Sequence, residues 1–83
     1  MAKTHTIEIK KKAYPTDTAV AKGDTVEWVN KMPMTHTVTA DDGSFDSGAF
    51  GNGKSFSKVF DTAGTFAYHC NFHGEMRGKV TVT

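Results

Sequence analysis

Short segments rich in Thr, Val, Ile and aromatic residues, separated by clusters of Gly and Asp, constrain this chain more than any other feature of its sequence. No segment has a sustained helical period with helix start and stop signals, so the pattern predicts an all-β protein. The turn residues provide positive φ angles and side-chain bonds to the backbone at strand ends. We expect seven strands, at residues 4–10, 18–21, 25–30, 36–40, 55–60, 65–70 and 79–83.

Seven short strands in 83 residues predict a two-sheet β-sandwich, with alternate side chains in the core and loops at both ends. A chain of this length forms one domain, here residues 1–83, that buries about 60 to 65% of its unfolded surface. Trp28 is the expected core anchor, joined by Phe56 and Phe60. Lys58 shares their face, which indicates either a bulge or an edge strand.

The composition excludes several classes of function. A formal net charge of +1 gives no electrostatic basis for nucleic-acid binding, and no apolar run approaches the roughly 18 residues of a membrane span. The single cysteine cannot form an internal disulfide, so it is a free thiol or a ligand. Polar residues follow the first three positions without an apolar core, so we expect no signal peptide in this chain.

Four side chains with soft or borderline donors form a candidate metal site. Cys70, His73 and Met76 lie within seven residues, and His36 lies 34 residues before the cysteine. Each residue type alone is more often structural than a ligand. Together, a thiolate, two imidazoles and a weak thioether suit copper cycling between Cu(I) and Cu(II) better than zinc.

Strand periodicity selects among the histidines. Cys70 shares a strand face with Phe66 and Tyr68, so its side chain is expected to point into the core. His69 lies on the opposite face, and we exclude it as a ligand. His36 opens the strand at residues 36–40 with its side chain on the apolar face. Two separate strands are therefore predicted to direct ligands into one interior.

The chain resembles the blue (type 1) copper proteins in the positions of these four residues, and it is similar to a small cupredoxin of the plastocyanin or amicyanin type. Residues 21–30 resemble the second and third strands of that family. Residues 63–70 and 76–80 are similar to amicyanin, as are the two-residue gaps on either side of His73.

The resemblance implies a Greek-key β-sandwich of seven to eight strands, with one copper ion at one end and one-electron transfer between partner proteins. Cys70 would supply the equatorial thiolate, His36 and His73 the equatorial imidazoles, and Met76 the axial thioether. It also implies a monomer outside the cytoplasm, in the periplasm or an equivalent compartment. Redox partners would dock transiently near His73, on apolar residues that include Met34, Phe72 and either Phe50 or Pro33.

One departure from the family changes an expected contact. Many relatives have Asn after the first histidine and Ser or Thr after the cysteine, whereas this chain has Thr37 and Asn71 at these positions. We expect a side-chain contact between Thr37 and Asn71 to replace the usual one. The Thr37 backbone N–H would still donate to the Cys70 sulfur.

Two other functions compete with electron transfer. Met32, Met34 and His36 concentrate soft donors that could hold Cu(I) for storage or delivery. An enzyme is the weaker alternative, because no nucleophile–base pair, phosphate loop or second metal cluster accompanies the site. We expect no enzymatic activity.

Overall fold

The computed structural model describes residues 2–11 and 13–83. These residues form seven strands and no helix that is long and apolar enough to cross a membrane. The strands are β1 (Thr4–Ile9), β2 (Thr18–Val20), β3 (Asp24–Asn30), β4 (Thr39–Ala40), β5 (Ser55–Phe60), β6 (Gly64–His69) and β7 (Arg77–Val82).

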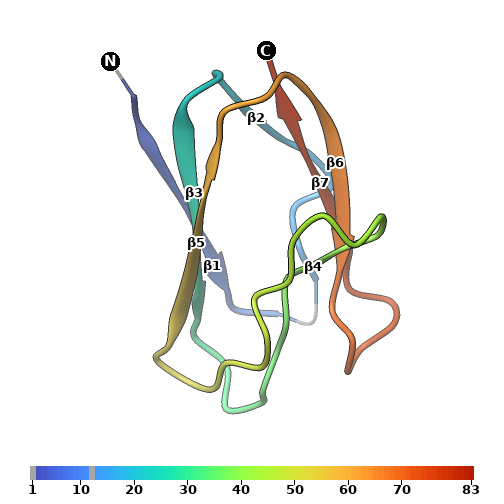
Figure 1. Cartoon of the computed structure of the whole chain (residues 1–83). Helices are drawn as coiled ribbons and strands as arrows, with labels where there is room; N and C mark the ends of the chain where they lie inside the picture. The colour runs from blue at the N-terminus through green and yellow to red at the C-terminus, as the bar shows by residue number, and fades with distance from the viewer. Residues whose placement is uncertain (1, 12) are drawn as a thin grey trace.

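The strands form two sheets that face each other, as Figure 1 shows. The strand order is β1-β3-β5 in one sheet and β2-β7-β6-β4 in the other. The pairs β1–β3 and β2–β7 are parallel, and the other pairs are antiparallel. The predicted all-β sandwich is confirmed.

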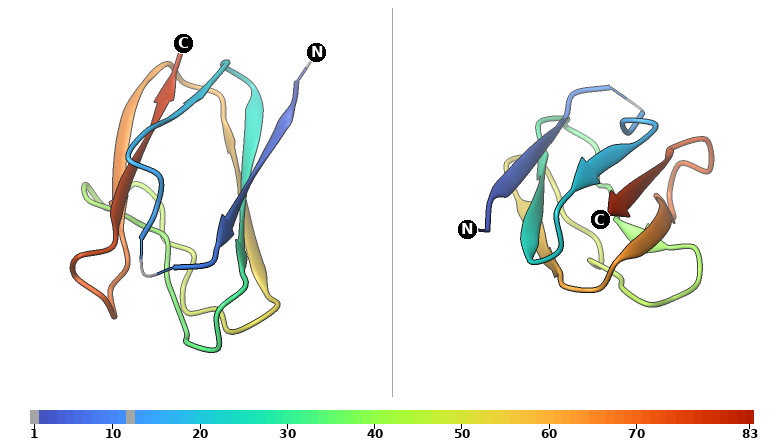
Figure 2. Two further views of the ribbon diagram at one scale, coloured as in Figure 1. Left: turned by 180° about the vertical axis from the view of Figure 1, so that it is seen from behind. Right: turned by 90° about the horizontal axis from the view of Figure 1, so that it is seen from above.

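Both termini lie at one end of the sandwich, and the predicted ligand segments lie at the other. Figures 1 and 2 show the loops at residues 31–35, 51–54 and 71–76 together at the end away from the termini. Loops from both sheets therefore meet where the candidate metal ligands were expected.

Six of the seven strands lie within two residues of their predicted ends, and the prediction at residues 36–40 is wrong in its extent. The chain before Thr39 pairs with an irregular loop. His36 and Phe50 form an isolated bridge, and the Val38 N–H donates to the Ser47 hydroxyl at 2.7 Å. A side-chain oxygen in place of a ladder carbonyl interrupts the regular strand.

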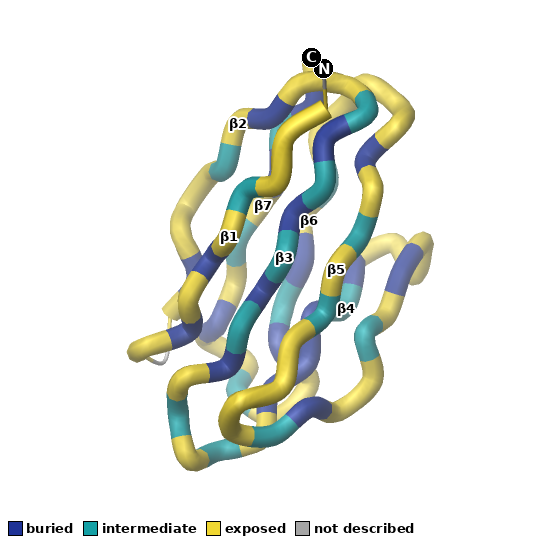
Figure 3. Tube along the Cα trace, turned by 90° about the vertical axis from the view of Figure 1, so that its left-hand side faces the viewer, coloured by how far each residue is buried: buried dark blue, intermediate teal, exposed yellow. Residues whose placement is uncertain are grey.

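Burial alternates along β3, as the sandwich requires. Val26, Trp28 and Asn30 are buried, whereas the residues between them are half-buried, and Figure 3 shows this alternation along the strand. Trp28 is therefore the core anchor that the sequence predicted.

The position of Lys58 is explained by the edge of a sheet. β5 pairs with β3 on one side only, and their register is continuous, without a bulge. The Lys58 ammonium lies 5.4 Å from the Phe45 ring centroid and 5.5 Å from that of Phe60. The charge thus lies against aromatic rings at the rim of the core.

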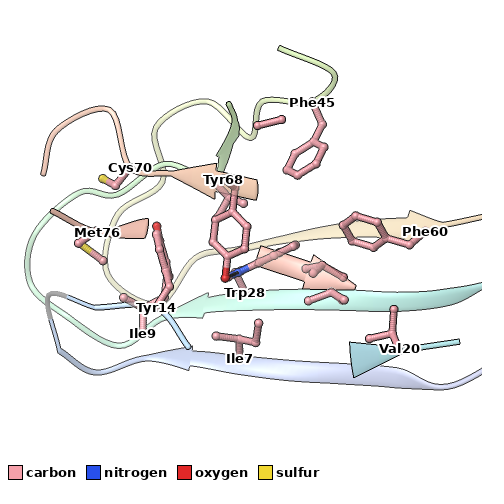
Figure 4. Packing of buried hydrophobic residues seen from close by; sticks show 14 of the residues in the cluster. Ile7, Ile9, Tyr14, Val20, Trp28, Phe45, Phe60, Tyr68, Cys70 and Met76 are labelled. Carbon is pink, nitrogen blue, oxygen red and sulfur yellow. Dashed lines mark hydrogen bonds between the residues drawn. The ribbon is translucent and has the colours of Figure 1, made fainter. Parts of the chain in front are cut away.

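Aromatic residues connect the two sheets in the core. The Trp28 indole N–H on β3 donates to the Tyr68 hydroxyl on β6 at 3.3 Å, and the two rings meet edge to face. The centroid of the Tyr14 ring lies 4.9 Å from that of the Tyr68 ring. Figure 4 shows the side chains of Tyr14, Trp28 and Tyr68 together. Burial raises the pKa of Tyr68 to about 12, so this hydroxyl remains neutral.

A buried carboxylate organises the end of the sandwich near the termini. Asp24 accepts hydrogen bonds from the Lys3 and Ala21 N–H groups and lies 2.8 Å from the His5 ring nitrogen. The bond to His5, followed by the two backbone bonds, lowers the pKa of Asp24 to about 2. His5 is therefore structural and lies far from the candidate ligands.

We predict that Gly78→Ala destabilises the fold by about 1–3 kcal/mol, the usual range for overpacking. Gly78 pairs with Tyr68 across the β6–β7 ladder. A Cβ at this position would lie 2.7 Å from the Pro15 carbonyl oxygen and 2.8 Å from the Tyr68 hydroxyl. Urea denaturation of the metal-free protein measures the change.

Gly51→Ala is the matched control, because a Cβ at Gly51 meets no atom within 4 Å. It should change stability by no more than about 0.5 kcal/mol. Equal denaturation midpoints for Gly78→Ala and the parent would contradict the close approach of Tyr68.

Candidate metal centre

Three of the four predicted ligands meet at the loop end of the sandwich. The donor atoms of His36, Cys70 and His73 all lie within 4.8 Å of one another. The Cys70 Sγ is 3.6 Å from the His73 Nδ1 and 3.9 Å from the His36 Nδ1. His36 and Cys70 are buried and His73 is half-buried, so one side of the group lies near solvent.

His36 and Cys70 are placed by different parts of the sandwich. Cys70 follows directly after β6, which ends at His69. His36 lies between β3 and β4, where its N–H and C=O each bond to the Phe50 backbone, at 3.1 and 3.0 Å. Both side chains point inward, as strand periodicity predicted.

Two backbone hydrogen bonds within the loop between β6 and β7 hold that loop in place. The Cys70 N–H donates to the Met76 carbonyl at 3.0 Å, and the Met76 N–H donates to the His73 carbonyl at 2.9 Å. Met76 is fully buried, and Figure 4 shows its side chain and that of Cys70 at the same end of the core. The assignment of Met76 as the fourth ligand stays a prediction.

The expected side-chain contact between Thr37 and Asn71 is replaced by a different hydrogen bond between the same two residues. The Asn71 backbone N–H donates to the Thr37 hydroxyl at 2.9 Å, whereas the Asn71 side chain donates to the Thr39 hydroxyl at 3.2 Å. The predicted side-chain contact is thus a backbone-to-side-chain bond. The Thr37 N–H lies 3.5 Å from the Cys70 sulfur, the donor geometry that was expected.

His69 lies outside the group of donors, in agreement with its exclusion. Its Nδ1 is 2.6 Å from the Asp41 carboxylate, and its Nε2 is 3.0 Å from the Asn71 side-chain oxygen. Arg77 approaches the same carboxylate at 3.6 Å. His69 therefore belongs to a polar cluster on the outside of the sheet.

Two residues that support the site were missed by the sequence analysis. Tyr14 donates from its hydroxyl to the Thr37 carbonyl at 2.6 Å, and Asn30 bonds to the loop that precedes His36. Tyr14 lies between β1 and β2, outside any alternating pattern. Asn30 was assigned only as the end of a strand. Both residues are recognised only by their burial and their tertiary contacts, which no local sequence motif reveals.

The arrangement fits copper by its donor chemistry. A thiol and two imidazoles converge, and a thioether is buried at the same end of the core. Thiolate and imidazole suit both copper and zinc, whereas a thioether is a soft donor that favours copper.

Comparison with known proteins agrees with this reading. The cupredoxin-like domain family matches residues 1–82. The chain belongs to the cupredoxins. This cupredoxin is 35% identical to a plastocyanin of Scenedesmus fuscus over 81 residues, which cover 82% of this chain and 83% of the relative. It is 38% identical to an amicyanin of Paracoccus denitrificans over 87 aligned positions, which cover 92% of this chain and 63% of that protein.

Solved amicyanin structures have the same fold. An oxidised amicyanin mutant superimposes with a TM-score of 0.88 at 33% identity, covering 95% of this cupredoxin and 81% of that chain. A reduced amicyanin mutant superimposes with a TM-score of 0.89 at 31% identity, covering 96% of this cupredoxin and 82% of that chain. The predicted fold, type 1 copper cofactor and electron-transfer class are confirmed by these relationships and by the cluster of donors.

We predict that Thr37→Val destabilises the metal-free protein by about 1–3 kcal/mol, because valine keeps the shape but leaves the Asn71 N–H without its acceptor. Thermal unfolding followed by circular dichroism measures the effect. Thr6→Val is the control, since the Thr6 hydroxyl forms only an exposed 3.4 Å contact with Glu27. The prediction is wrong if both variants unfold at the same temperature.

Proposed function

We propose that this chain transfers single electrons between redox partner proteins through one type 1 copper ion bound by His36, Cys70, His73 and Met76. The observation that carries the proposal is the convergence of the Cys70 sulfur and two imidazole nitrogens within 4.8 Å at one end of the sandwich. When bound, the copper ion supplies the Cu(II)/Cu(I) couple.

The side chains of the site have distinct tasks in this proposal. Cys70 binds as the thiolate, and the two histidines bind through their Nδ1 atoms, which face the sulfur. The Thr37 N–H, 3.5 Å from that sulfur, stabilises charge on the thiolate. Met76 supplies a weak, soft donor that favours the reduced ion.

Backbone hydrogen bonds fix the two segments that carry these ligands. The His36–Phe50 bridge fixes one segment, and the Cys70–Met76 and Met76–His73 bonds fix the other. Ligands that stay in place in both oxidation states need little rearrangement when an electron arrives. This preorganisation supports rapid outer-sphere electron transfer and requires no bond-making by the protein.

The partner surface in this proposal surrounds His73, which is half-buried in the loop between β6 and β7. The adjacent Phe72 is 58% exposed, Pro33 is exposed and Met34 is half-buried. Phe50 is buried and belongs to the core, so Pro33 is the better fourth member of the patch. A patch this small supports transient docking of a monomer.

The copper-handling alternative is not favoured. Met32 packs against the hydrophobic core, and hydrogen bonds to Asn30 hold the backbone at Met32 and Met34. These residues therefore have structural roles in the loop before His36. The proposal also makes the chain a carrier and not an enzyme, because four protein ligands leave no position for a substrate.

The proposed location is the periplasm or another compartment outside the cytoplasm, as the family resemblance implies. Immunodetection in fractionated cells of the source organism, with cytoplasmic and periplasmic markers as controls, tests this location.

We predict that the copper-loaded parent has an intense visible copper–thiolate absorption band that disappears reversibly on one-electron reduction. Cys70→Ser should lose the band, because serine removes the thiolate. His73→Ala should also change the band strongly, whereas His69→Ala should retain it. Colourless Cu(I) held by Cys70→Ser through Met32 and Met34 would instead support copper handling.

We predict that Phe72→Ala lowers the bimolecular rate of electron transfer to a redox partner about threefold to thirtyfold, because it removes apolar contact area from the docking surface. Stopped-flow mixing with the partner measures this rate. The absorption band should remain unchanged.

Val59→Ala is the matched control, since Val59 is 52% exposed on β5, away from the ligand loops. The docking assignment fails if both variants react with the partner at the parent's rate.

A further inference from the structure

Asn30, at the end of β3, has an unusual position for a polar side chain because it is fully buried. Its side-chain oxygen accepts the Met32 N–H at 2.9 Å. Its amide nitrogen donates to the Met34 carbonyl at 2.7 Å and to the Phe50 carbonyl at 3.0 Å. One amide group therefore binds two loops that are separate in the sequence.

The backbone of the same residue extends this connection. The Asn30 N–H donates to the Lys54 carbonyl at 2.9 Å, and its C=O accepts the Gly53 N–H at 2.7 Å. The segments at residues 31–35 and 50–54 thus meet at the end of β3. Figure 1 shows both loops at the end of the sandwich away from the termini.

Both contacts of the amide nitrogen lead to a candidate copper ligand. Met34 is two residues before His36 in the chain, and Phe50 exchanges two backbone hydrogen bonds with His36. Within the described part of the chain, the side-chain hydrogen bonds of Asn30 go to backbone groups and not to the donor atoms themselves. Its bonds instead fix the segment that leads into His36 and the segment that pairs with it.

We infer that Asn30 is a positioning residue that fixes the His36 imidazole for copper binding, an assignment that rests on the proposed electron-transfer function. The role requires two donors and one acceptor in a short side chain, which asparagine provides. Aspartate lacks both donors, and serine has only one. Either replacement removes at least one donor to the Met34 and Phe50 carbonyls, and the Phe50 carbonyl then depends more on the His36 N–H that it also accepts.

The first test uses the metal-free protein and measures hydrogen exchange by NMR. In Asn30→Ser, the His36 and Phe50 amides should exchange about tenfold faster than in the parent, after correction for the change in global stability. The amides of the β6–β7 ladder provide that correction. Unchanged exchange at His36 and Phe50 would overturn the inference.

Two further variants keep this test decisive. Asn30→Asp preserves the volume of the side chain and the acceptor for Met32, so it serves where Asn30→Ser does not fold. Asn52→Ala is the matched control, because the Asn52 side chain donates to the Met32 carbonyl of the same loop at 3.0 Å but is exposed. It should leave exchange at His36 unchanged.

The second test separates positioning of a ligand from general support of the fold. Copper-loaded Asn30→Ser, which adds no charge, should retain a copper–thiolate band, have a higher reduction potential than the parent and release Cu(II) several-fold faster. The reason is that Cu(II) depends more than Cu(I) on a firmly held imidazole donor. Asn52→Ala should match the parent in all three measurements.

The outcomes distinguish this inference from the proposed function. An Asn30 variant with fast exchange but the parent's spectrum, potential and copper release would make Asn30 structural only, and the electron-transfer proposal would stand. Absence of the copper–thiolate band from the parent itself would overturn the proposed function and this inference with it.

Discussion

The contact between Trp28 and Tyr68 is the interaction on which the rest of the structure depends. It joins β3 in one sheet to β6 in the other through an edge-to-face ring contact and a 3.3 Å hydrogen bond. Tyr14 packs against the same tyrosine and donates its hydroxyl to the Thr37 carbonyl. The core is thereby connected directly to the ligand segments, because the N–H of Thr37 points to the Cys70 sulfur.

The candidate ligands reach the same end of the molecule only when the two sheets are packed. Cys70, His73 and Met76 lie between β6 and β7, whereas His36 lies on the chain from β3 to β4, 34 residues before the cysteine. An ion that binds this arrangement and not the unfolded chain stabilises the fold by mass action. A domain of 83 residues has a modest core, so such a contribution is a substantial fraction of its stability.

Strand periodicity was sufficient to predict the direction of two candidate ligands. Alternation placed Cys70 and His36 inward and His69 outward, and burial of the first two side chains agrees. The predicted extent of the strand was wrong at residues 36–38, because these residues pair with an irregular loop in which the Ser47 hydroxyl serves as an acceptor. Asn30 was missed for a similar reason, since its three side-chain bonds join loops whose meeting is a tertiary event.

Thr37 and Asn71 are joined by a hydrogen bond that uses the side chain of one residue and the backbone of the other. A hydroxyl acceptor at Thr37 needs only a donor opposite, and the backbone N–H of residue 71 supplies it. The Asn71 side chain is then available to contact Thr39 and His69, and His69 contacts Asp41. Hydrogen bonds therefore run from the outer surface of the sheet to the residue that donates to the Cys70 sulfur. The bond between the two segments thus uses the backbone of residue 71 as donor and the side chain of Thr37 as acceptor.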